Sequence, residues 1–212
     1  MSKRIINKAT EEETISKVRG MIDYMHPKIE VKARETFVHE NEYAIKVIKR
    51  KVDFHLAFYA WFLLKYELPN GATAMEMADS FPLNFFTKNE KKIIKNFLHY
   101  KDSLFEIEKI SKDKKDYTIK DLLDNKFYLI KTLDMPNKFS KKQLIKTMII
   151  QNIEGNYFFY GSVQSFNIEY KEEFIKEMIN IIRLENIIKE KRKEGFIEWK
   201  FDKEQTSKKE ES

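Results

Sequence analysis

Lysines and aromatic residues gather in the middle of the chain in a pattern that could bind nucleic acid. Three lysines fall within SKDKKD at 111–116, and three more lie in DMPNKFSKKQ at 134–143. Lysine ammonium groups neutralise phosphates, and rings beside them can stack on unpaired bases. The candidate binding residues are Lys112, Lys114, Lys115, Tyr117, Lys138, Lys141 and Lys142. A plainer interpretation stays open, in which the lysines keep turns soluble and the alternating rings fill a core.

No motif in the sequence defines a catalytic or metal centre. The four histidines are scattered, and none belongs to HExxH or another tight metal-binding spacing. The five glycines form no phosphate-binding loop, and no nucleophile elbow or kinase signature is present. Cysteine is absent, which excludes thiol nucleophiles and zinc ribbons. We therefore expect no catalytic residues, metal or cofactor, with an enzyme that lacks a recognisable motif as the least favoured hypothesis.

A protein-interaction module is the competing hypothesis. The helix expected at 170–194 is amphipathic, and Phe196, Trp199 and Phe201 follow it as candidate partner-docking residues. Aromatic residues are enriched in interface cores, so these faces could belong to an adaptor or a complex subunit. Salt separates the two hypotheses, because phosphate contacts weaken steeply with salt and apolar docking does not.

Composition indicates a soluble, cytoplasmic protein with a sizeable core. The 212 residues are 42% hydrophobic, and 40 Lys and Arg against 34 Asp and Glu give a modest net charge of +6. The most apolar stretch, FYAWFLL at 58–64, is far shorter than the roughly 20 residues that span a bilayer. We therefore expect no membrane contact and a partner that is RNA, a ribonucleoprotein or another protein.

Residues 1–100 are expected to be mainly helical. Thr10 with Glu13, Thr73 with Glu76 and Thr87 with Glu90 all have capping-box spacing. The first helix should end near His26-Pro27, and the next should run from Lys28 to Tyr66 with a break near Glu40-Asn41.

Residues 101–168 are expected to form a small β module. Hydrophobic alternation predicts strands at 103–110, 117–123, 124–131, 144–153 and 157–163, with a Gly155-Asn156 turn in the last hairpin. Five short strands predict an antiparallel, barrel-like module. Ser140 with Gln143 also has capping-box spacing, so 141–151 could instead be helical.

The predicted fold class is therefore α+β, with a helical N-terminal half, this β module and a C-terminal amphipathic helix. A helix and docking segment should occupy 169–201, followed by a disordered charged tail at 202–212. Phe54, Phe58, Trp61 and Phe62 form a wide apolar stripe, which we interpret as the core seam between the helical half and the β module.

Three stretches in the middle of the chain share a pattern with other proteins: FHLAFYAWFLLKYELPNGATAMEM, SLFEIEKI and IKDLLDNKFYLI. With them the chain resembles a diffuse family of uncharacterised bacterial and archaeal proteins. That family has an aromatic F-x-x-W-F helix, a Leu-x-x-Gly-x-Thr turn and a small β module, and some members carry a cysteine-rich zinc tail. The resemblance covers roughly residues 54–163 and implies an architecture rather than an activity. This chain lacks the zinc tail, has Asn125 where a turn glycine is expected, and has Lys141-Lys142 where Pro-Gly or Gly-Asp is expected.

Overall fold

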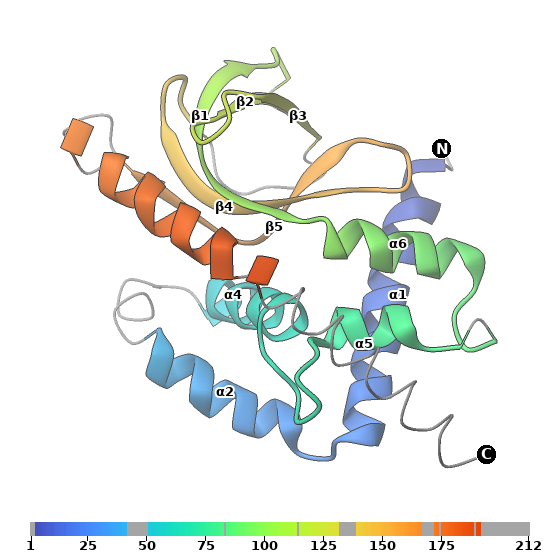
Figure 1. The fold of residues 1–212 in the computed structure, drawn as a ribbon. Coiled ribbons are helices and arrows are strands. Elements are labelled where there is room, and N and C mark those ends of the chain that lie inside the picture. The colour runs from blue at the N-terminus through green and yellow to red at the C-terminus, as the bar shows by residue number, and fades with distance from the viewer. Residues whose placement is uncertain are drawn as a thin grey trace. The chain divides into compact units, whose positions relative to one another are not determined.

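A computed structural model describes residues 3–41, 51–82, 84–113, 115–131, 139–166, 172–173, 175–188 and 190–191. The chain divides into two compact units, residues 1–168 and 169–212, and each is described by itself. The fold is α+β, as the sequence predicts: the first unit contains helices followed by a five-stranded sheet (Figure 1). Its described helices are α1 (Lys3–Met25), α2 (Ile29–Glu40), α4 (Lys51–Leu64), α5 (Ala74–Ser80) and α6 (Lys88–Leu98).

Two of the three predicted capping boxes are confirmed. Thr73 and Thr87 are the N-caps of α5 and α6, and in both boxes the hydroxyl and the later glutamate bond reciprocally to backbone N–H groups. The prediction at Thr10 is wrong, because α1 begins at Lys3 and no helix-breaking residue interrupts it before Thr10. The expected end near His26 and break at Asn41 are confirmed by the limits of α1 and α2.

The strands are β1 (Lys101–Ile110), β2 (Asp116–Asp121), β3 (Phe127–Lys131), β4 (Leu144–Gln151) and β5 (Tyr157–Phe166). They pair in the order β1-β2-β3-β5-β4, and the pairing of β1 with β4 joins the two ends of that order. At the β3–β5 seam, however, the described residues form a single pair, Ile130 with Tyr157, and it is parallel. The sheet is therefore mixed and curled rather than a barrel with full ladders on every side, and the prediction of a wholly antiparallel module is wrong at this seam.

The segment with two possible structures, 141–151, is mainly a strand, because β4 begins at Leu144. The capping-box spacing before it forms a turn: the side-chain oxygen of Gln143 accepts from the Ser140 N–H at 2.8 Å. Lys142 has φ 68°, a left-handed conformation that ends any helical continuation. The turn then passes the chain into β4 beside β1, where Lys142 N–H donates to the Ile107 carbonyl at 2.7 Å.

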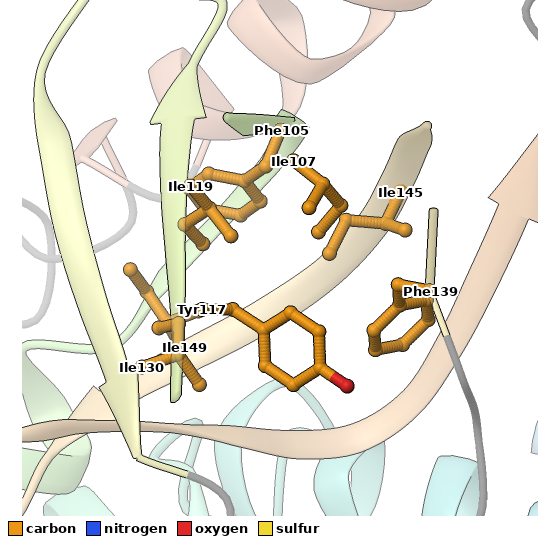
Figure 2. Packing of buried hydrophobic residues seen from close by; sticks show 8 residues of the cluster. All are labelled: Phe105, Ile107, Tyr117, Ile119, Ile130, Phe139, Ile145 and Ile149. Atoms are coloured by element: carbon orange, nitrogen blue, oxygen red, sulfur yellow. The ribbon is translucent and has the colours of Figure 1, made fainter. Parts of the chain in front are cut away.

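The interior of the curled sheet is apolar and contains aromatic face-to-edge pairs (Figure 2). Inward-facing residues alternate along the strands, as a half-buried strand requires. The buried cluster comprises Phe105, Ile107, Tyr117, Ile119, Ile130, Phe139, Ile145 and Ile149. Tyr117 meets the edge of Phe139 with ring centroids 5.4 Å apart.

The helical part packs on the sheet where α4 crosses β5 (Figure 1). Gly161 in β5 has φ +79°, and a Cβ at this position would lie 2.7 Å from the Cβ of Ala60 in α4. β5 bulges here, because its residues between Tyr160 and Gln164 face a single β4 residue, Thr147. The Thr147 hydroxyl donates to the Ser162 carbonyl at 3.3 Å and so holds the bulge.

The predicted seam between helices and sheet therefore exists, but Trp61 does not form its centre. Trp61 is only half-buried, and its ring lies 5.3 Å from Phe37 of α2 and 5.1 Å from Tyr66. The stripe on α4 is thus shared: Ala60 faces β5, and Trp61 helps to pack α4 against α2.

The second unit contains a helix among the described residues 172–191. Ile182 is buried, while several apolar neighbours are about half exposed or more. These exposed residues are Ile181, Leu184, Ile187 and Ile188. The predicted docking residues Phe196, Trp199 and Phe201, and the predicted tail at 202–212, lie outside the described residues.

Candidate nucleic-acid interface

Tyr117, the predicted stacking ring, is in the core. Its side chain is 3% exposed and points into the curled sheet, where burial raises the pKa of its phenol (Figure 2). The ring therefore cannot stack on a base, and its predicted role is wrong. The cause is the alternation of β2, which places Tyr117 and Ile119 inside and Thr118 and Lys120 outside.

The described lysines of the predicted site lie in two separate turns. Lys112 and Lys115 are exposed in the β1–β2 hairpin, and Lys141 and Lys142 are exposed in the turn before β4. That second turn meets β1 at Ile107, whereas the hairpin begins at Ser111, about 13 Å farther along the strand. Lys114 and Lys138 lie outside the described residues.

Lys142 is already paired within the protein. Its ammonium lies 2.6 Å from a carboxylate oxygen of Glu106 and 3.1 Å from one of Glu108. The hydrogen bonds that Lys142 donates, first to Glu106 and then to Glu108, raise the pKa of Lys142. Because the two carboxylates offset its charge, Lys142 is a weaker phosphate contact than its exposure suggests.

The outward-facing side of β2 and β3 carries a different combination of lysine and ring. Register places Glu106, Lys120 and Phe127 in one cross-strand row and Lys109, Thr118 and Leu129 in the next. We call these six residues the outer β1–β3 face. Phe127 is 62% exposed and Leu129 49% exposed. This face therefore presents exposed apolar side chains with lysines beside them.

A charged cluster fixes the turn at the edge of this face. Lys101 pairs with Asp121 and Asp124, each at 2.8 Å, and Lys126 lies 3.6 Å from Asp124. Although burial opposes its charge, hydrogen bonds to the two aspartates raise the pKa of Lys101. Lys126 is 72% exposed one residue before Phe127, so it adds a second cation beside the ring.

Phe127 lies outside both lysine clusters, and the sequence signal for it is the alternation of its strand. In FYLIK at 127–131, alternation separates Phe127 and Leu129 from Tyr128 and Ile130. Alternation alone does not say which set faces the core. The structure shows that Ile130 is buried and Phe127 exposed.

The outer β1–β3 face has cations and apolar surface but no recognisable catalytic group. Among the described residues, no cluster of three histidine, aspartate or glutamate side chains could hold a metal ion. None of the described helices is both long and apolar enough to cross a membrane. What this face can do chemically is bind, by ion pairing and by contact with flat apolar groups.

The first unit is thus an α+β fold in which α4 and α6 pack against strands β5 and β4 of a curled five-stranded sheet. The chain belongs to DUF7986, a family of unknown function, whose model matches residues 1–206. No curated protein matches the chain. No solved structure matches it either.

Proposed function

We propose that this protein binds single-stranded RNA, alone or within a ribonucleoprotein, through the outer β1–β3 face. The observation that carries the proposal is Phe127, a ring 62% exposed on a strand and paired across the sheet with Lys120. A base can stack on such a ring while the neighbouring ammonium contacts the phosphate. Five-stranded, partly open barrels bind oligonucleotides on the same part of the sheet, their second and third strands.

Fluorescence anisotropy with a labelled RNA of about 12 nucleotides tests the proposal, since single-strand sites cover about 4–16 nucleotides. Phe127→Ala should weaken binding by about 1–3 kcal/mol, the usual worth of one stacked base. Lys120→Ala should weaken binding and reduce its salt dependence between about 50 and 200 mM KCl. Matched controls are Tyr24→Ala and Lys32→Ala, which remove an exposed ring from α1 and an exposed charge from α2.

Equal affinities for all four variants would refute the proposed face, and no RNA binding by the unmodified protein would refute the function. Circular dichroism of each variant confirms that its fold is intact. Phe127 and Lys120 point away from the core cluster, so neither substitution leaves a cavity there.

A second candidate function is protein binding through the helix of the second unit. Its support is the exposure of Leu184 and Ile188, at 60% and 67%, on adjacent turns of that helix. A stoichiometric partner that survives nuclease and high salt, and is lost on Leu184→Glu, would favour this function over RNA binding.

A further inference from the structure

A polar cleft lies between α1 and α2, on the helical part of the first unit. The two helices are joined by a short turn at residues 26–28 (Figure 1). The cleft has a volume of about 560 Å³, which is in the range of small-molecule sites. It is lined by Ser16, Arg19, Gly20, Asp23, Lys28, Glu30, Val31 and Arg34. Three cations thus face two carboxylates.

The guanidinium of Arg19 is held in a fixed position on one wall. It lies over the Tyr59 ring, 3.9 Å from the centroid, and its Nη2 donates to the Tyr59 hydroxyl at 2.7 Å and to Glu30 at 3.1 Å. Tyr59 in turn donates to Glu30 at 2.8 Å. Burial alone would raise the pKa of Glu30, but the bonds from Tyr59 and Arg19 lower it, so Glu30 is an anion. Within the described residues, the buried Nε of Arg19 has no hydrogen-bond partner.

Arg34 and Lys28 supply the other two cations. Arg34 lies over the Phe58 ring, 4.3 Å from the centroid, and its contact with Glu30 is long, at 3.5 Å. Lys28 is exposed and immediately precedes α2, and its side chain makes no capping bond to that helix. Lys28 and Arg34 therefore both favour an anion beside α2, and the Glu30 carboxylate in the first turn opposes them only in part because Arg19 and Tyr59 already bond to it.

Gly20 lines the cleft without a side chain that would occupy it. It lies inside α1, where glycine weakens a helix relative to alanine. A Cβ built at Gly20 would meet nothing within 4 Å, so no neighbouring group requires a glycine for close packing. Its effect is to leave the helix surface accessible between Arg19 and Asp23.

We propose that this cleft binds a small molecule through a phosphate group, which contacts Arg34, Lys28 and the exposed side of Arg19. Planar guanidinium groups match phosphate oxygens in geometry, and stacking on Phe58 and Tyr59 already orders them. The volume exceeds that of a phosphate, so the rest of the molecule lies over Gly20, where Asp23 can accept a hydrogen bond from a hydroxyl group.

Thermal unfolding and calorimetry at constant ionic strength test this site, with glycerol 3-phosphate, inorganic phosphate, glycerol and chloride as probes. We expect glycerol 3-phosphate to bind and to raise the midpoint, and glycerol and chloride to have no effect. If inorganic phosphate raises the midpoint as much as glycerol 3-phosphate does, the site binds the bare ion, and the part of the proposal that places the rest of a molecule over Gly20 is wrong. The proposal would be overturned if neither glycerol 3-phosphate nor inorganic phosphate raised the thermal midpoint more than chloride does.

Two substitutions test the cleft without removing packing. Lys28→Gly suits the left-handed φ of 68° at this position and removes one cation, so the protein should fold and its affinity should fall at least about tenfold. Gly20→Leu fills the open space and strengthens the helix, so it should abolish binding while raising thermal stability.

The matched control is Lys32→Ala, which removes a charge from an exposed position of α2 that does not line the cleft. It should bind glycerol 3-phosphate as the unmodified protein does. If Lys28→Gly and Gly20→Leu also bind normally, the anion lies elsewhere and the proposal is wrong.

Discussion

Adding one methyl group at Gly161 is a test of how closely helix α4 packs against strand β5. In Gly161→Ala the new Cβ would lie 2.7 Å from the Cβ of Ala60, well inside van der Waals contact. The residue also has φ +79°, a region that costs an L-residue about 1–2 kcal/mol. Overpacking adds about 1–3 kcal/mol, so we expect a total loss of about 2–5 kcal/mol in the free energy of unfolding.

Urea unfolding followed by circular dichroism measures this loss. Gly155→Ala is a matched control, because Gly155 has φ +87° but its Cβ would meet only the flexible Gln151 side chain, at 3.7 Å. It should cost the backbone strain alone, about 1–2 kcal/mol. Adding Ala60→Gly to Gly161→Ala removes the facing methyl group and should recover part of the difference. Equal losses for the two glycine variants would refute the close approach of α4 and β5.

Three further predictions concern single side chains. Lys91 is 8% exposed and donates to the carbonyls of Ala78, Asp79 and Phe81 at 2.7–2.8 Å, so Lys91→Met should cost about 2–3 kcal/mol in urea unfolding. Burial raises the pKa of Glu11 to about 7, although a hydrogen bond from the Ile153 backbone acts to lower that pKa. Folding therefore favours the protonated acid, and the stability that Glu11 provides is lost as pH rises from about 4.5 to about 7. Glu11→Gln should raise the thermal midpoint relative to the unmodified protein at pH 8 but not near pH 4. Asn125 has φ 60°, so Asn125→Val should cost about 1–2 kcal/mol while Asn125→Gly is tolerated, and equal midpoints would contradict this.

Local signals in the sequence were the most informative about the fold. The boxes at Thr73 and Thr87 fixed the starts of two helices because each is completed within four residues. The resemblance that implied glycine near Asn125 and Lys142 was also informative, since both residues have the left-handed conformation that glycine adopts readily.

Long-range pairing and strand orientation were not predictable from the sequence. The parallel pair of Ile130 and Tyr157 joins residues far apart in the chain, and no local pattern encodes it. Alternation in β2 and β3 separated two faces but did not assign the inner one. Alternation alone therefore does not show that Tyr117 faces the core and Phe127 the solvent.

The β3–β5 seam should open locally more easily than the β1–β4 seam, because fewer backbone pairs hold its described residues together. β1 and β4 share a ladder from Lys101 with Ile149 to Glu106 with Leu144, whereas among the described residues β3 and β5 share the single backbone pair Ile130 with Tyr157. Amide hydrogens along the β3–β5 seam should therefore exchange with solvent through small openings, and those between β1 and β4 only through larger unfolding events. β3 also carries Phe127, so the proposed RNA-contacting strand would be held to the sheet mainly by its ladder with β2 and only weakly on its other side.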